Sequence, residues 1–327
     1  MIITRTPLRI SLGGGGTDLP SYYQNAGSGF LVAAAISKFV FIAVNRNFDE
    51  DLLLKYSKIE KVANWDHVRH PILRECLSTA GIQNGIEISS MADIPAGTGL
   101  GSSGSFTVGV LKALLRYDHK SRSNLEIAQL ASHIEMVQLS EPVGKQDHYI
   151  SAIGGVTAFT FHDDERVDVE PLALSIDTRE KLDDNLLLFY TGIRRSASEV
   201  LLSERDNPLN SGTELRRNLD LTKEFGLRTR ECLTRGDLTI FGALLTEQWG
   251  LKYHRQPSVV HDQVDEWIRR GIRAGAYGGK LVGAGGGGFL LFYAEEKARL
   301  RSIMRELGLP EVVFRVDYDG SSVIAAS

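Results

Sequence analysis

Glycine is concentrated in three short segments of this chain. Of its 33 glycines in 327 residues, fifteen lie within residues 13–16, 97–104 and 278–288. Because glycine has no side chain, a cluster of glycines lets the backbone approach another group closely, and phosphate is the commonest candidate for that group. The three clusters therefore predict a fold that brings backbone segments against a phosphate-bearing ligand.

The rest of the composition is that of an ordinary globular protein. Hydrophobic residues make up 43% and charged residues 24% of the chain, and its formal net charge is -4. This balance argues against a general nucleic-acid or anionic-membrane surface, so we expect no nucleic-acid partner and no membrane association. Cys76 and Cys232 are far apart and indicate neither a disulfide scaffold nor a metal site. The first residues lack the apolar run of a signal peptide, so we expect a cytoplasmic protein.

The hydrophobic pattern predicts a mixed α and β chain. The first half contains strand-like segments at 2–12, 37–46, 52–57, 86–92 and 155–161. One helix follows the second glycine cluster, and an S-x-x-E capping box at Ser123 and Glu126 begins another, which Pro142 ends. The second half is mainly helical, with predicted helices at 196–206, 211–234, 237–253, 258–274 and 296–307, and strands at 185–190, 281–282, 289–293 and 312–316. We expect two domains, residues 1–170 and 171–327.

The second glycine cluster lies in the segment 95–105 (PAGTGLGSSGS), which opens a predicted helix. Its successive backbone N–H groups and the partial positive charge of a helix N-terminus suit the phosphates of a nucleotide. The spacing is not that of a Walker A loop, and taken alone the glycines also fit a plain tight turn. The residues expected to bind the nucleotide are Pro95, Gly97, Gly99, Leu100, Gly101, Ser102, Ser103 and Gly104.

Two further motifs accompany this loop, residues 7–18 (PLRISLGGGGTD) and residues 280–289 (KLVGAGGGGF). With all three motifs in this order, the chain resembles the GHMP small-molecule kinases over essentially its whole length. The resemblance implies an α+β fold of two domains, an N-terminal domain like ribosomal protein S5 and a C-terminal ferredoxin-like domain. It also implies ATP in the cleft between them, Mg²⁺ as cofactor, and phosphoryl transfer to an alcohol group.

Within the family, the chain is most similar to the kinases of D-glycero-D-manno-heptose 7-phosphate. These kinases carry a GGGGTDLP run, here residues 13–20, and a TGIxRSA segment after a strand, here residues 191–197. The galactokinase stretch GEHTD is absent, because three glycines precede Thr17 and Asp18. That difference argues against galactose as the substrate.

The resemblance also implies which residues are catalytic. Asp147 matches the family's G-x-x-D position and is the expected base, and the adjacent His148 is expected to pack or support it. Arg9 lies at the basic position of the first motif, where it would stabilise charge near the nucleophile. Taken alone, an aspartate in a loop is usually a turn or cap residue and a strand arginine is usually on the surface.

A magnesium site is implied by two oxygen ligands. Glu135 matches the family glutamate that holds Mg²⁺, and Ser103 would add a hydroxyl from the glycine loop, with Ser102 as the alternative. Such hard oxygen ligands are those that Mg²⁺ prefers. Without a metal, Glu135 would be an ordinary solvated glutamate on a helix, and Ser102 and Ser103 would be ordinary helix-capping residues.

For the sugar, Asp18 is the expected ligand, because a carboxylate accepts strong hydrogen bonds from paired hydroxyls, and Thr17 is expected to assist. A substrate phosphate needs a cationic clamp, for which Arg194 and Arg195 are the candidates. They also fit two solvated arginines at the start of a helix. In the third motif, Gly285 and Gly286 are expected to close over the substrate.

These expectations combine into one functional hypothesis. The chain would phosphorylate the anomeric hydroxyl of D-glycero-D-manno-heptose 7-phosphate to the 1,7-bisphosphate, towards nucleotide-activated heptose, with a small-molecule sugar phosphate as its partner. One alternative is a fucokinase-like sugar-1-kinase acting on an unphosphorylated sugar. Another is a non-catalytic sugar and ATP sensor. The sequence leaves the oligomeric state open.

Overall fold

The computed structural model describes the chain except for residues 195–211, 256–258, 284 and 327. Two β-sheets organise these residues, a large sheet built mainly from the first half of the chain and a small sheet built from the second half. Helices pack on both, and the predicted α+β class is confirmed.

The large sheet contains eight strands in the described residues. They are β1 (Ile2–Gly13), β2 (Ser28–Arg46), β3 (Leu52–Lys55), β4 (Ile59–Val62), β5 (Ile86–Ala92), β6 (Val156–His162), β7 (Val167–Pro171) and β11 (Ser322–Ala326). The order is β11-β1-β2-β5-β3-β4, and β6 and β7 extend the sheet from the first part of β2. The sequence predicted β2 only from residue 37, because residues 29–36 are all buried and show no alternation of polar and apolar side chains.

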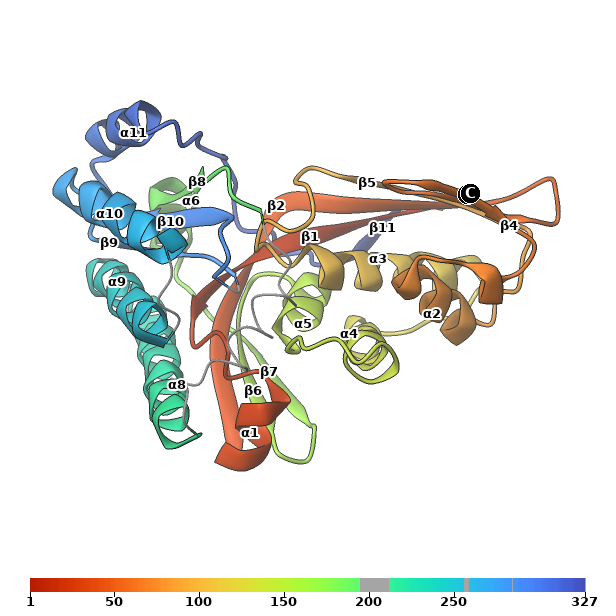
Figure 1. Ribbon diagram of the computed structural model, residues 1–327, viewed down its shortest axis with the longest axis horizontal. Coiled ribbons are helices and arrows are strands. Elements are labelled where there is room, and N and C mark those ends of the chain that lie inside the picture. Colours follow the sequence, from red (N-terminus) through yellow and green to blue (C-terminus); the bar gives the residue numbers. More distant parts are fainter. Residues whose placement is uncertain (195–211, 256–258, 284, 327) are drawn as a thin grey trace.

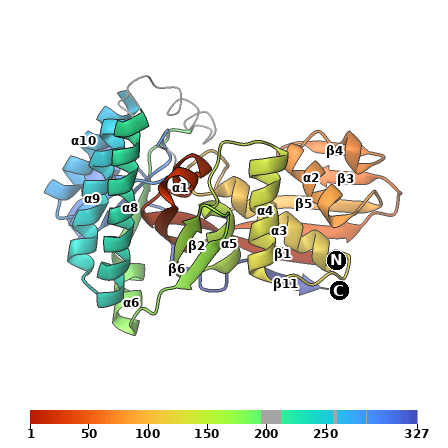
Figure 2. The ribbon, with the colours of Figure 1, turned by 90° about the horizontal axis from the view of Figure 1, so that it is seen from below.

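The helices of the first half are α1 (Pro20–Ala26), α2 (Pro71–Ala80), α3 (Ser102–Tyr117), α4 (Asn124–His133) and α5 (Gln146–Ile153). Figures 1 and 2 show α2 to α5 together on one face of the large sheet. The predicted capping box is confirmed, since the Ser123 side chain accepts from the Glu126 N–H and the Glu126 carboxylate accepts from the Ser123 N–H. The chain continues from α4 into a π turn, Ile134–Gln138, before it reaches α5.

The small sheet has the order β8-β10-β9, all antiparallel, formed by β8 (Leu186–Tyr190), β9 (Gly278–Leu281) and β10 (Phe289–Tyr293). Its helices are α6 (Ile176–Asn185), α8 (Gly212–Arg235), α9 (Leu238–Arg255), α10 (Val259–Arg273) and α11 (Lys297–Glu306). The predicted helices at 211–234, 237–253, 258–274 and 296–307 are confirmed to within two residues at each end. The predicted helix at 196–206 lies outside the described residues.

The predicted strand at 312–316 is wrong. Only isolated bridges occur there, from Glu311 to Phe189 of the small sheet and from Val316 to Ile36 of the large sheet. The segment therefore crosses from one sheet to the other, and Val313, which sequence pattern placed in a strand, is 72% exposed. Beyond it, β11 pairs antiparallel with β1, so the two chain ends lie close together (Figure 2). The domain division at residues 170 and 171 stays a prediction: β1 to β7 precede it almost entirely, while β11 returns to the large sheet.

The hydrophobic core joins the two halves of the molecule. The larger cluster of buried side chains covers the large sheet and also includes Leu233 of α8, with Phe241 and Leu245 of α9. A second cluster lies within the small sheet and its helices, around Phe292 and Trp249. Because α8 and α9 also pack on the large sheet, they lie beside the first glycine cluster, where Gly13 approaches Thr229 of α8.

Candidate active site

A cleft of about 1350 Å³ is lined by residues of all three glycine clusters. One wall comes from β1, the N-terminus of α3 and the N-terminus of α5, and the other comes from α8, α9 and the third glycine cluster. Pockets that hold one small molecule typically measure about 300–1000 Å³. The cleft therefore has room for two ligands at once.

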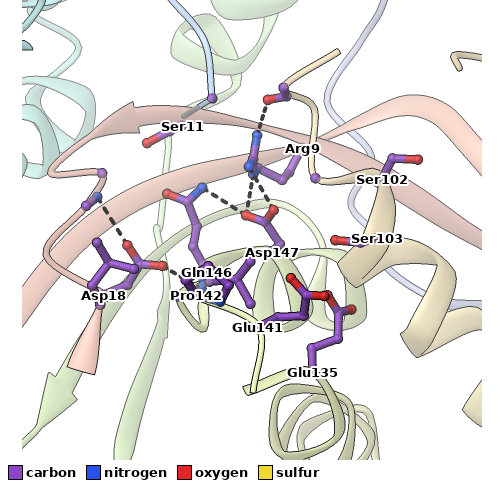
Figure 3. Close-up of a pocket in the computed structure, with 18 of the residues that line it drawn as sticks. Arg9, Ser11, Asp18, Ser102, Ser103, Glu135, Glu141, Pro142, Gln146 and Asp147 are labelled. Carbon is purple, nitrogen blue, oxygen red and sulfur yellow. Dashed lines mark hydrogen bonds and ion pairs between the residues drawn. The ribbon is translucent and has the colours of Figure 1, made fainter. Parts of the chain in front are cut away.

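Arg9 and Asp147 meet in this cleft (Figure 3). Arg9 donates from Nε to Asp147 Oδ1 over 2.7 Å and from Nη2 to Oδ2 over 2.8 Å, a two-bond pairing that fixes both groups. The third guanidinium nitrogen, Nη1, donates to the carbonyl of Gly99. The pair thus binds the large sheet, α5 and the glycine loop to one another.

Asp147 lies in a helix rather than in the loop that the sequence led us to expect. It lies in the first turn of α5, which begins at Gln146. The partial positive charge of a helix N-terminus favours a carboxylate there. The Gln146 side chain also donates from Nε2 to Asp147 Oδ1 over 3.3 Å, a contact that the sequence did not indicate.

The glycine loop packs directly on this pair. Gly101, with φ of +75°, precedes α3, and a Cβ there would lie 2.9 Å from Arg9 Cγ. A Cβ on Gly104 would lie 2.8 Å from Asp147 Cβ. Glycine at both positions thus lets the N-terminus of α3 approach Arg9 and Asp147. Of the predicted nucleotide-binding residues, the cleft is lined by Gly97, Gly99, Gly101, Ser102 and Ser103, whereas Pro95, Leu100 and Gly104 do not line it.

The third glycine cluster lies against the second. A Cβ on Gly99 would lie 2.8 Å from the Val282 carbonyl oxygen, and a Cβ on Gly283 would lie 2.5 Å from the Gly99 carbonyl oxygen. Gly285 and Gly286 line the cleft, as the sequence analysis expects. The two loops therefore meet through backbone atoms rather than through side chains.

Glu135 is the buried carboxylate of the site, with an exposed fraction of 2%. The π turn carries it, and extra residues in such turns often occur at functional sites. Its Oε1 accepts from Thr107 Oγ1 over 2.5 Å and lies 3.1 Å from His148 Nε2. Burial raises the pKa of Glu135, but the charge of His148 and the hydrogen bonds from His148, Thr107 and Ser103 outweigh burial and lower it. The carboxylate is therefore ionised, and His148 acts as its partner.

The donor set fits a magnesium ion. Glu135 supplies an ionised oxygen and Ser103, within hydrogen-bond reach of it, supplies a hydroxyl at the start of α3. Among the described residues no group of three His, Cys, Asp or Glu could hold a metal. Mg²⁺ commonly takes only one or two carboxylates from the protein and completes its shell with phosphate and water. Glu135 and Ser103 would therefore hold the ion at the phosphate end of the cleft.

Asp18 lies on the side of Asp147 away from Ser103 and Glu135 in the view of Figure 3. Its Oδ1 accepts from the Gly16 N–H over 3.1 Å and its Oδ2 accepts from the Gln146 N–H over 3.0 Å. Burial is the largest influence and raises the pKa of Asp18 despite these hydrogen bonds. The carboxyl group lines the cleft beside Arg9 and Asp147, where it can bind hydroxyl groups.

Two predicted substrate residues are not brought into the cleft. The Thr17 hydroxyl is fully buried, and donates to the carbonyls of Gly14 and Phe30, so it holds the turn that presents Asp18 rather than facing a ligand. Arg194 is exposed, donates to the Tyr190 hydroxyl and does not line the cleft. Arg195 lies outside the described residues.

Other residues that belong to no glycine motif also line the cleft. Lys252 and Arg255 come from the end of α9. Tyr56, His70 and Phe106 form an aromatic group at another part of the lining, with ring centroids 4.7 Å apart for Tyr56 and His70 and 5.3 Å apart for His70 and Phe106. Such faces suit a flat aromatic ligand such as adenine. Tyr56 was considered from the sequence as a neighbour of the adenine base, whereas Lys252, Arg255, His70 and Phe106 were not.

Two family models match the chain. The model of the GHMP kinases N terminal domain matches residues 66–155, and the model of the GHMP kinases C terminal matches residues 229–309. The chain belongs to the GHMP kinases. The recognition made from three motifs is thus confirmed, and so is the enzyme class of that family, a phosphotransferase with an alcohol group as acceptor. GHMP kinases use ATP as a substrate. Among the described residues, no helix is both long and apolar enough to cross a membrane.

Several relatives of this chain are named as sugar kinases, and others are named as mevalonate kinases. The chain is 27% identical to D-glycero-alpha-D-manno-heptose 7-phosphate kinase from Campylobacter jejuni, with 94% of each chain covered. It is 26% identical to the bifunctional fucokinase/GDP-fucose pyrophosphorylase of Arabidopsis thaliana over 92% of its own length and 30% of that protein's. Among solved structures, a D-glycero-D-manno-heptose 1-phosphate kinase from Bacteroides thetaiotaomicron is similar in fold, with a TM-score of 0.81, 22% identity and full coverage of both chains. These similarities indicate a small-molecule substrate.

Proposed function

We propose that this protein is an ATP- and Mg²⁺-dependent kinase of D-glycero-D-manno-heptose 7-phosphate, acting in the cytoplasm. The anomeric hydroxyl oxygen would form a bond to the γ-phosphorus of ATP as the bond to the β-γ bridging oxygen breaks. The products would be ADP and the 1,7-bisphosphate. The observation that carries the proposal is the Arg9–Asp147 pair directly beside the glycine loop, between Asp18 and Glu135.

In this proposal Asp147 orients the anomeric hydroxyl and accepts its proton at a carboxylate oxygen. Arg9 holds that carboxylate in place through two hydrogen bonds and adds positive charge where negative charge develops. Phosphoryl transfer depends mainly on such positioning and charge stabilisation. The N-terminus of α3 and the glycine loop bind the phosphates through backbone N–H groups.

Glu135 and Ser103 would hold the magnesium ion, which would neutralise phosphate charge when bound. Thr107 and His148 fix the Glu135 carboxylate before any ligand is present. Asp18, held by two backbone N–H groups, binds the sugar hydroxyls on the other side of Asp147. Each substrate therefore has its own carboxylate, and Asp147 lies where the two substrates meet.

The choice of heptose 7-phosphate rests on two observations. The GGGGTDLP run and the TGIxRSA segment agree with that sub-family, and the similarity to the Campylobacter jejuni enzyme extends over 94% of both chains. The similarity to a plant fucokinase supports the second candidate, a sugar-1-kinase for an unphosphorylated sugar.

A substrate panel tests the proposal. The purified protein is given ATP and Mg²⁺ with D-glycero-D-manno-heptose 7-phosphate, the free heptose, fucose or galactose, and ADP release is measured. We expect the heptose phosphate to give the highest kcat/KM, with phosphorus NMR placing the new phosphate on the anomeric carbon. A preference for free fucose would favour the second candidate, and binding of ATP and sugar without ADP release would favour a sensor.

A further inference from the structure

The last turn of α9 places two cations in the wall of the cleft. Lys252 and Arg255 are three residues apart, so they lie on the same face of the helix, and both line the cleft. The C-terminal end of a helix favours positive charge because its carbonyl groups carry partial negative charge. The proposed chemistry at Asp147 gives neither residue a role.

Arg255 lies beside the turn that presents Asp18. Its Nη2 is 3.8 Å from the place that a Cβ on Gly16 would occupy, and Gly16 N–H donates to Asp18 Oδ1. Arg255 is 8% exposed, and its Nη1 donates to Asn218 Oδ1 over 3.0 Å. Asn218 in turn donates to the Leu251 carbonyl, so α8 fixes the direction of the guanidinium. A planar guanidinium held in this way is suited to bind phosphate with two hydrogen bonds.

Lys252 and Lys280 extend the positive charge along the same wall. Lys252 donates to the carbonyl of Gly283 in the third glycine motif. Lys280, from β9, is 7% exposed and donates to the Leu12 carbonyl over 2.9 Å. Burial, followed by the positive charges of Lys252 and Arg9, lowers the pKa of Lys280 to about 7. These like charges oppose one another, and a bound anion would relieve that repulsion.

We propose that Arg255 and Lys252 bind the distal phosphate of the sugar substrate, with Lys280 adding positive charge behind them. This inference rests on the proposed function and names the part of the site that selects a phosphorylated sugar. One carboxylate oxygen of Asp18 accepts from the N–H of Gly16, which lies beside Arg255. The other oxygen accepts from the N–H of Gln146, which precedes Asp147. A sugar held at Asp18 therefore has its reacting end towards Asp147 and its phosphate towards α9. Arg194, the earlier candidate, is exposed and outside the cleft lining.

The test compares two acceptors in the full-length protein. Steady-state kinetics with heptose 7-phosphate and with the free heptose are measured for the parent, Arg255→Ala, Arg255→Lys, Lys252→Met and Arg194→Ala. Arg235→Ala removes an exposed arginine at the end of the neighbouring helix α8 and is the matched control. Thermal unfolding of each variant checks that it is folded.

We expect Arg255→Ala to lower kcat/KM for heptose 7-phosphate by more than about tenfold, as truncating a buried charged contact does. The effect should fall mainly on KM, with KM for ATP and kcat/KM for the free heptose changed by less than about threefold, because neither contains the distal phosphate. Lys252→Met should show the same selectivity, and Arg255→Lys a smaller loss, since lysine keeps the charge without the two-bond geometry.

The outcomes separate the two proposals. A parent enzyme that uses the free heptose as well as the phosphate would overturn the proposed function. If the parent prefers heptose 7-phosphate, and Arg255→Ala and Lys252→Met keep that preference, the proposed function stands. The assignment of Arg255 and Lys252 to the distal phosphate is then overturned. Equal losses with both acceptors, or a selective loss in Arg194→Ala only, would also contradict the assignment to α9.

Discussion

At the scale of single residues, the proposed chemistry depends on the carboxylate of Asp147, which accepts two hydrogen bonds from Arg9. Asp147→Asn keeps the size of the side chain but removes the proton acceptor and turns an amide N–H₂ towards the guanidinium. We predict that kcat falls by about 10²–10⁴-fold, the usual contribution of a general base. ATP affinity should stay within a few fold, because the glycine loop is unchanged. Asp163→Asn, in an exposed turn, is the control, and a kcat near that of the parent would remove Asp147 from the mechanism.

Glu135→Gln tests the proposed magnesium ligand. A neutral amide is a much poorer ligand for a hard dication than a carboxylate, so we predict a higher Mg²⁺ concentration for half-maximal activity, with partial recovery at high Mg²⁺. The same change leaves His148 buried without its anionic partner, so the thermal midpoint should also fall. Activity is titrated against Mg²⁺ beside Glu224→Gln, a change on the exposed face of α8. An unchanged Mg²⁺ titration would mean that Glu135 has only a structural role.

At the scale of elements, the sequence predicted where helices and strands lie in the chain better than it predicted their local backbone conformation. The capping box of α4 and the glycine-rich entry to α3 are local signals, and both elements occur where they were expected. The π turn that carries Glu135 could not be predicted, because it depends on the packing of Glu135 against Thr107 and His148. The strand expected at 312–316 failed for a similar reason, since its two ends bond to different sheets.

The entry to α3 allows a matched test of the glycine loop. Gly101 and Gly85 both have positive φ, +75° and +73°, but a Cβ on Gly101 would meet Arg9, whereas none of the described atoms lies within 4 Å of a Cβ on Gly85. Alanine at either position should cost about 1–2 kcal/mol of stability, the penalty of left-handed backbone. Only Gly101→Ala should also lower kcat, by more than about tenfold, because it displaces the Arg9 side chain from Asp147. Equal kcat values in Gly101→Ala and Gly85→Ala would show that the loop tolerates a side chain beside Arg9 and Asp147.

At the scale of the whole molecule, the glycine motifs predicted the family but not the full lining of the cleft. Arg9, Asp147 and Gly101 belong to motifs and were predicted from them, although they are far apart in the chain. Arg255 belongs to no motif, and it lies beside Gly16 only because α9 packs against both sheets. A sequence pattern can indicate which residues recur in a family, whereas the neighbours of a given turn depend on how distant elements pack.

Lys280 connects the two sheets at this junction. It lies in β9 of the small sheet, and its Nζ donates to the carbonyl of Leu12 in β1 of the large sheet. Because burial and the nearby cations lower its pKa to about 7, the folded protein releases this proton near pH 7. The unfolded chain keeps the proton until its ordinary pKa of 10.5.

We predict from this difference that the parent protein becomes more stable relative to Lys280→Met as the pH rises from about 7 to about 9. Between those values the unfolded chain binds more protons than the folded protein, so the contribution of Lys280 to the free energy of unfolding rises with pH, by up to about 1.4 kcal/mol per unit. Below pH 7 both states hold the proton and the contribution is constant. Urea unfolding of the parent, Lys280→Met and the exposed control Lys58→Met at about pH 7, 8 and 9 measures the trend, because these pH values lie between the two pKa values of Lys280. The stability difference between the parent and Lys280→Met changes with pH only if the folded protein releases the Lys280 proton. A difference that stays constant with pH would therefore show that Lys280 remains protonated in the folded protein.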